Sequence, residues 1–148
     1  MTNILLINPN TTKSITDLVL KTAKGFASKG TRLRALTGSF GPRYIASRAA
    51  YAIASHAALD AYANDRGPKD VVVLACFGDP GLAALKELSP VPVVGMADAS
   101  ILQACAISMA EGLALQKPAK ATNGALAKPG TVDSIRLSKG LSKLLQSP

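Results

Sequence analysis

The chain has few of the residues from which metal sites and nucleotide sites are built. Its 148 residues include no tryptophan, one histidine (His56) and two cysteines (Cys76 and Cys105). These three side chains are widely separated in sequence and fit no zinc pattern, so we expect no metal site. The glycine loops match neither G-x-G-x-x-G nor a P-loop, which leaves a nucleotide site without support.

Long apolar runs and aromatic clusters are also missing. No run of 18 apolar residues occurs, so we expect no membrane span. No basic segment precedes an apolar one near the N-terminus, which predicts no signal peptide and a cytoplasmic protein with reduced thiols. The net charge is +8, and six of the 17 basic residues follow Glu111. These six stand singly without aromatic neighbours on which bases could stack, so we expect no nucleic acid partner.

The pattern that is present alternates strand-like and helical segments. Compact apolar or alternating runs predict four strands, at 3–7, 31–36, 70–75 and 90–95. Helical spacing predicts helices between and after them, at about 12–26, 45–64, 80–88 and 98–113. This order implies an α/β domain over residues 1–113, with an open parallel sheet of about four strands and helices on both faces.

Two further expectations concern the first helix and the end of the chain. The first helix carries an apolar stripe that we expect to be buried against the sheet: Ile15, Leu18, Val19, Thr22 and Phe26. Residues 114–148 lose the periodic pattern and predict an irregular basic tail, with one short helix within 134–145.

Cys76 follows the buried third strand and precedes a glycine-rich turn. Asp79 is expected to cap the next helix, with Pro80 as its first residue. The positive end of that helix would lower the pKa of the thiol, and Gly78 would let backbone donors approach a ligand. Two interpretations of Cys76 follow: a reactive thiol, or an inert buried residue that ends the strand.

Three loops are expected at one edge of the sheet, because they follow the carboxyl ends of parallel strands. They cover residues 8–12, 38–44 and 76–81. Asparagine and threonine side chains in the first loop suit carbonyl or carboxylate oxygens of a ligand. The same residues are also ordinary turn and capping residues, and one side chain can serve in both ways.

Three motifs together carry a resemblance to a known family. Ile7-Asn8-Pro9-Asn10-Thr11-Thr12, Ala75-Cys76-Phe77-Gly78-Asp79-Pro80-Gly81 and Pro92-Val93-Val94-Gly95 stand in order within residues 3–105. In this respect the chain resembles the Asp/Glu/hydantoin racemase superfamily, and most closely the hydantoin racemases. The resemblance implies two similar α/β halves with the active site between them. Each half supplies one cysteine, and the two thiols work without a cofactor on opposite faces of a stereogenic carbon.

The resemblance assigns roles to six residues. Cys76 matches the catalytic cysteine of the first half, and the matched substrate-binding positions are Asn8, Thr12, Tyr44, Phe77 and Gly78. The implied activity is the racemisation of 5-substituted hydantoins or related amino-acid derivatives by cysteine acid/base chemistry. A thiol suits this task because it serves as base or acid near neutral pH, so two of them can exchange roles.

The segment that carries the second cysteine of the family has no counterpart in this sequence. Cys105 lies in an alanine-rich helical stretch, where we expect a core residue rather than a second acid. An alternative function is therefore a truncated, non-catalytic half-domain that binds a small molecule or pairs into a homo-oligomer through an uncovered apolar face. A cysteine hydrolase is a further alternative, but His56 is the only histidine that could serve as its base.

Overall fold

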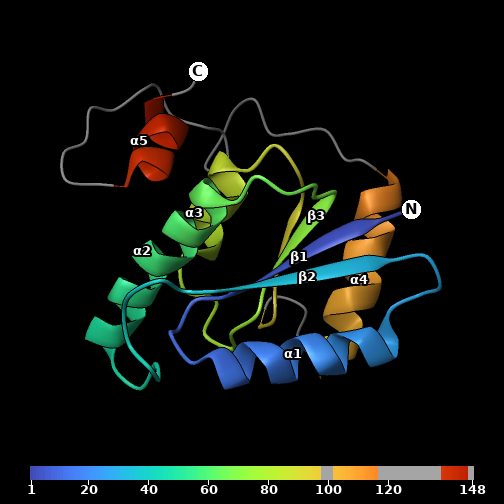
Figure 1. The fold of residues 1–148 in the computed structure, drawn as a ribbon, viewed down its shortest axis with the longest axis horizontal. Coiled ribbons are helices and arrows are strands. Elements are labelled where there is room, and N and C mark those ends of the chain that lie inside the picture. The colour runs from blue at the N-terminus through green and yellow to red at the C-terminus, as the bar shows by residue number, and fades with distance from the viewer. Residues whose placement is uncertain (98–101, 117–137, 147–148) are drawn as a thin grey trace.

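The computed structural model describes residues 1–97, 102–116 and 138–146. Its centre is a parallel sheet with the strand order β2-β1-β3-β4. The strands are β1 (Asn3–Asn8), β2 (Arg32–Thr37), β3 (Val71–Leu74) and β4 (Val93–Gly95). The helices are α1 (Lys13–Phe26), α2 (Arg48–Asn64), α3 (Leu82–Leu88), α4 (Leu102–Gln116) and α5 (Lys139–Gln146). This confirms the predicted open α/β fold, in which the partly exposed strand β2 lies at a sheet edge (Figure 1).

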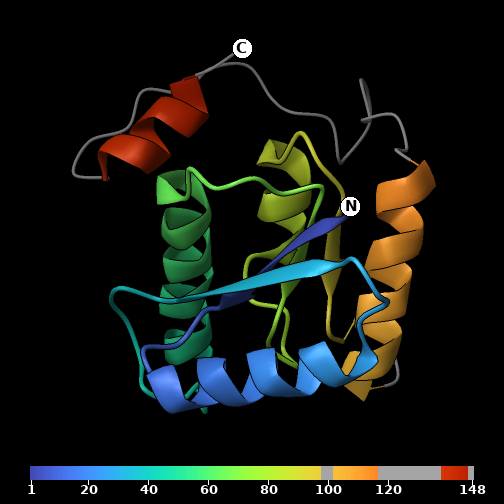
Figure 2. The same ribbon diagram turned by 45° about the vertical axis from the view of Figure 1, so that its right-hand side comes forward.

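Alternate residues of the central strands enter two separate cores. Ile4 and Leu6 of β1 face a core that includes Ala23 of α1 and Ile107 of α4. The residues between and after them, Leu5 and Ile7, face a second core with α2 and α3. Helices therefore cover both faces of the sheet, with α1 and α4 on one side and α2 and α3 on the other (Figure 2). The side chains of β1 and β3 are almost wholly buried, as expected for central strands of a parallel sheet.

Two helix starts differ from the prediction. α2 begins three residues later than expected, because Ser47 caps it and accepts a hydrogen bond from the Ala50 N–H at 3.1 Å. α3 begins at Leu82, two residues later than expected, and Asp79 does not cap it. Asp79 has φ +47°, a left-handed backbone, whereas a capping residue usually has an extended one. Gly81 takes the position before the helix, with φ +83°.

α1 packs on the sheet through a face that coincides only in part with the predicted apolar stripe, since Val19 of that stripe packs against the core. Its buried residues are Thr16 and Ala23, whose small side chains allow the helix to approach the strands closely. Leu18 and Phe26, which we expected to be buried, are 62% and 52% exposed. The prediction of their burial was wrong because α1 carries apolar residues beyond the sheet-facing side, and Leu18 and Phe26 lie where the sheet does not cover the helix.

Beyond residue 137, the described part of the tail forms a helix at 139–146, which overlaps the segment 134–145 where we expected one. This helix, α5, packs against the end of α2 (Figure 1). Leu141 is 3% exposed, and a Cβ atom on Gly140 would lie 2.9 Å from the carbonyl oxygen of Ala63. The rest of the predicted irregular tail, residues 117–137, lies outside the described residues. The described part of the tail is therefore helical and packed on the domain.

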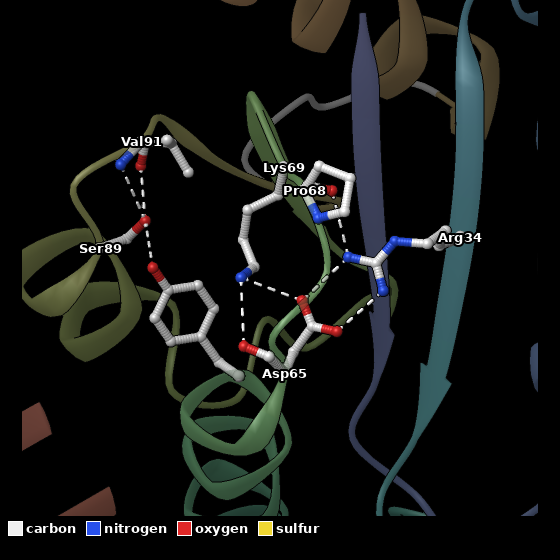
Figure 3. A network of polar contacts seen from close by, with 7 residues as sticks. Arg34, Asp65, Pro68, Lys69, Ser89 and Val91 are labelled. Atoms are coloured by element: carbon white, nitrogen blue, oxygen red, sulfur yellow. Dashed lines mark hydrogen bonds and ion pairs between the residues drawn. The ribbon is translucent and has the colours of Figure 1, made fainter. Parts of the chain in front are cut away.

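A charged network joins three elements at the amino edge of the sheet (Figure 3). Asp65, which follows α2, accepts hydrogen bonds from both terminal nitrogens of Arg34 in β2, at 2.8 and 2.9 Å. Lys69, just before β3, lies 3.0 Å from the same carboxylate. The hydrogen bonds from Arg34 outweigh the effect of burial and lower the pKa of Asp65 to about 2. Nearby, Tyr62 donates a hydrogen bond to Ser89 at 3.1 Å, which links α2 to the end of α3.

Asp65→Asn should lower the free energy of unfolding by about 2 kcal/mol at pH 7, as measured by urea denaturation. The pKa of Asp65 in the folded state, about 2, is below its ordinary value of 3.8. The charged carboxylate therefore stabilises the fold fully at any pH above about 3.8. The difference between wild type and variant should shrink as the pH falls towards 2. The matched control is Asp17→Asn, which removes an exposed partner of Lys13 on α1 and should change stability by less than about 0.5 kcal/mol. Equal losses in the two variants would contradict the prediction.

Candidate active site

The carboxyl ends of the four strands meet at the edge of the sheet opposite the Asp65 network. Asn8 ends β1, Cys76 comes two residues after β3, and Met96 directly follows β4. The long loop after β2 leads into α2 at the same edge. Open α/β sheets bind ligands at this edge, outside the carboxyl ends of their strands.

An open cavity of about 1060 Å³ lies at this edge. Its wall is formed by the outer face of α1, the start of α2 with the loop before it, and the segment after β3. The residues from α1 are the five of the predicted apolar stripe: Ile15, Leu18, Val19, Thr22 and Phe26. The same wall includes Asn10, Tyr44, Tyr51 and Cys76. The cavity is at the upper end of the range usual for small-molecule sites, and its wall is mainly apolar.

Cys76 is half-buried in this wall. Burial raises the pKa of its thiol and the charge of Asp79 raises it further, against the lowering effect of a hydrogen bond from the Gly78 N–H. The predicted lowering by the helix is therefore wrong. α3 begins only at Leu82, six residues beyond the thiol. Cys76 is thus an accessible thiol that is mostly protonated at neutral pH.

The loop after Cys76 is held against α2 and β4. The hydroxyl of Tyr51 donates a hydrogen bond to the carbonyl of Asp79 at 3.3 Å. A Cβ atom on Gly78 would lie 3.3 Å from the Tyr51 ring, and a Cβ atom on Gly95 of β4 would collide with the Asp79 carboxylate. Sequence reasoning missed Tyr51, although it is the only aromatic side chain in the first turn of the alanine-rich helix α2.

Asn8 lies behind the cavity wall, and Asn10 lies in it. Asn8 is 1% exposed, and its NH₂ group donates to Asn10 Oδ1 at 3.0 Å and to Thr16 Oγ1 at 2.9 Å. Asn10 Oδ1 also accepts a hydrogen bond from the Thr12 N–H at 2.9 Å. Because the oxygen of Asn10 already accepts these two hydrogen bonds, its NH₂ group is the donor that this side chain can offer to a ligand in the cavity. The sequence pointed to this loop but not to which asparagine lines the cavity.

Thr12 also lies outside the cavity wall. It occupies the position before α1, but its side chain makes no capping bond. Instead its hydroxyl donates to the carbonyl of Arg43 at 2.7 Å, and the Thr11 N–H donates to the carbonyl of Pro42 at 3.1 Å. These two bonds hold the loop that carries Tyr44. Of the predicted site residues, the structure brings Tyr44, Phe77 and Gly78 into one wall with Cys76.

The wall of the cavity contains no histidine, aspartate or glutamate among the residues that the structure describes. His56 is exposed on α2 and packs edge-on against Phe40, with ring centroids 4.9 Å apart. It therefore gives no support to a cysteine hydrolase. The described residues hold no cluster of three or more potential metal ligands. Within them, no helix combines the length and apolarity that crossing a bilayer requires.

The sequence profile of the Asp/Glu/hydantoin racemase family matches residues 4–115. The chain belongs to this family. Similar relatives are the hydantoin racemases of Paenarthrobacter aurescens, 41% identical over 100 residues, and of Pseudomonas sp. (strain NS671), 34% identical over 99 residues. The matches cover 66% of this racemase-family chain, but only 42% and 40% of these relatives.

Solved structures of two allantoin racemases resemble this racemase-family fold. The enzymes from Pseudomonas fluorescens and Klebsiella pneumoniae each give a TM-score of 0.65 at 36% sequence identity. The matches cover 66% and 68% of this chain, and 42% and 41% of those chains. The chain thus spans less than half the length of the relatives that it matches. The helix α5 lies beyond the part that the family profile matches.

Proposed function

We propose that the chain is a cofactor-independent isomerase that acts on the stereogenic carbon of 5-substituted hydantoins or related amino-acid derivatives, with Cys76 as acid and base. The observation that carries the proposal is an accessible thiol in the wall of a ligand-sized cavity, in a chain of the Asp/Glu/hydantoin racemase family. Hydantoin and allantoin, the compounds after which the relatives are named, are cyclic ureides with a C–H bond beside a carbonyl group.

The proposed step is a proton transfer at this carbon. The Cys76 thiolate takes the proton, and the electron pair of the C–H bond moves onto the carbonyl oxygen as an enolate. Asn10 supports this role, because it lines the wall and its side-chain oxygen accepts hydrogen bonds from Asn8 and Thr12, which leaves the NH₂ group as the donor for a substrate oxygen. A fixed N–H donor beside the oxygen stabilises the charge that develops there. Asn8 and Thr12 are then positioning residues, and Tyr44, Phe77 and Gly78 shape the site.

A second candidate is a half-domain that binds such a compound without turning it over. The observation in its favour is that the described wall residues include no second cysteine and no histidine, aspartate or glutamate that could donate a proton from the other face. Racemisation needs a proton donor on the face opposite the base, so a lone thiol would exchange the proton without inverting the carbon.

Proton exchange in D₂O distinguishes the two candidates. The purified chain is incubated with one enantiomer of a 5-substituted hydantoin, deuterium uptake is followed by NMR and chirality by polarimetry, and a blank without protein gives the spontaneous rate. Uptake together with racemisation is the expected result. Uptake with retained chirality would indicate a site with one working face, and no uptake above the blank would contradict the isomerase for this substrate class.

Thr12→Val should raise the KM for the hydantoin about 2- to 10-fold, because it removes the hydrogen bond to Arg43 that holds the loop with Tyr44. The stereochemical outcome should not change, since Thr12 is not in the cavity wall. The matched control is Thr11→Val, which removes the neighbouring hydroxyl. The Thr11 hydroxyl makes no hydrogen bond within the described residues. If both variants or neither changed KM, Thr12 would not position this loop.

A further inference from the structure

An uncovered apolar face surrounds the mouth of the cavity. Leu18 and Phe26 of α1 are 62% and 52% exposed, and Tyr44 and Phe77 across the cavity are 74% and 71% exposed. All four side chains line the same hollow. α1 lies on the outside of the fold in both views, and the described chain leaves this side of the helix open (Figures 1 and 2). Large contiguous apolar patches on soluble proteins mark sites of interaction.

The size of this face fits a protein partner. At these exposures, three aromatic side chains and one leucine present on the order of 500 Å² of surface. A stable interface buries about 800 Å² on each partner, with aromatic residues near its centre. Four side chains therefore supply more than half of the area that each subunit of a stable dimer needs.

We propose that this face is the two-fold interface of a homodimer, in which the cavities of two copies join and both Cys76 thiols reach one substrate. In a two-fold dimer the same patch meets itself, so a thiol at the rim of one cavity recurs across the axis in the other. The interface stands on the exposed face alone. The shared substrate rests on the function proposed above, and it supplies the second acid that the wall of a single copy does not contain.

The chemistry of the joined site balances without any added reagent. The thiolate of one copy takes the proton from the substrate carbon, and the thiol of the other copy gives its proton to the opposite face of the enolate. One proton is removed and one is returned, so the substrate changes only its configuration. The two thiols have then exchanged protonation states, which suits them for the reverse direction.

The positive charge of the chain predicts how salt should change the affinity of the dimer. Each copy carries a net charge of +8, and α1 contributes three lysines against one aspartate. Two such faces repel each other, and salt screens this repulsion. The dimer should therefore tighten as salt is raised. An acidic partner on the same face would instead bind more weakly at high salt.

Sedimentation velocity on the full chain tests the interface without reference to activity. We expect a monomer–dimer equilibrium that shifts to dimer with concentration and with salt. Leu18→Lys and Phe26→Lys should each be monomeric, with unchanged circular dichroism because both residues are exposed. The matched control is Met109→Lys, a 44% exposed apolar residue of α4 outside the cavity wall, which should dimerise like wild type. A wild-type chain that stays monomeric throughout overturns the proposal.

Crosslinking tests whether the two thiols share one cavity. In a Cys105→Ala background, a short bismaleimide should join two chains through Cys76, and Leu18→Lys should abolish this product. Dimers that sediment as such but do not crosslink would place the interface elsewhere and overturn the joined site. If crosslinking succeeds and no hydantoin is turned over, the interface stands and the proposed function fails.

Mixing experiments test the joined site in an active preparation. Excess Cys76→Ala chain is added to wild type, and racemisation is expressed per wild-type chain. It should fall as mixed dimers form, because each site would then hold one thiol. A rate per wild-type chain that does not change would show that one copy is sufficient and would overturn the sharing of thiols.

Discussion

Cys76→Ala should reduce deuterium uptake into a 5-substituted hydantoin by about 10²- to 10⁴-fold, the range that a positioned acid or base contributes. The variant loses the only thiol in the described cavity wall, and this wall contains no histidine, aspartate or glutamate that could replace it as base. The fold should survive, since Cys76 is half-buried in a turn after β3 rather than packed within the sheet. Uptake is measured by NMR, and circular dichroism confirms folding. Equal uptake by variant and wild type would remove Cys76 from the mechanism.

The pH dependence of the wild-type reaction gives a second readout of the same thiol. Burial raises the pKa of Cys76, so the protonated form dominates at neutral pH and the thiolate fraction grows as the pH rises. The rate of proton removal should therefore climb with pH and level off only above the ordinary thiol value of 9.0. A plateau already reached at neutral pH would indicate a pKa lowered by a partner that faces the thiol.

Asn8→Ala should lower the free energy of unfolding by about 2–4 kcal/mol. Asn8 is buried and donates to Asn10 and Thr16, so its loss leaves two buried acceptors without this donor. The interaction is part of a chain, since Thr16 also exchanges a hydrogen bond of 2.7 Å with Thr37 of β2. Removing one member of a buried network costs more than removing an isolated bond.

Urea denaturation of Asn8→Ala and Asn3→Ala measures this effect in a matched pair. Asn3 lies in the same strand, and its side chain makes one exposed hydrogen bond to Asp70. Its loss should cost less than about 1 kcal/mol. Asn8→Ala should also weaken ligand binding, because Asn10 loses one of the two donors that orient its amide. If Asn8→Ala lost no more stability than Asn3→Ala, this would contradict the prediction that the network holds the loop.

The sheet was predictable from sequence because the polarity pattern of each strand indicates how much of that strand is buried. Val71–Leu74 is apolar on both faces, as a central strand requires, and Arg32–Thr37 alternates, as an edge strand does. The position of Cys76 at the carboxyl edge follows from the strand that precedes it. These features depend on a few neighbouring residues, and local pattern is sufficient to find them.

The parts that sequence reasoning missed depend on contacts between distant segments. The residue pair Asp79-Pro80 satisfies the local rule for a helix start, but the backbone of Asp79 is left-handed and its carboxylate packs over Gly95 of β4. Asn8 and Asn10 are both buried polar residues at the end of β1, and the hydrogen bond of Asn8 to Thr16 of α1, eight residues away, holds it behind the cavity wall that Asn10 lines. The spacing of apolar residues found a face of α1, but spacing does not say which surface that face meets.

In α1, the residues that stabilise the fold are largely different from the residues that line the cavity. The face that contacts the sheet includes the buried Thr16 and Ala23 together with Val19 and Leu20, while Leu18 and Phe26, which line the cavity, are largely exposed. A combinatorial library restricted to Leu18, Thr22 and Phe26 should therefore yield mostly folded chains, whatever their binding properties. This helix offers a position where new specificity can be selected without first adding stability elsewhere in the domain.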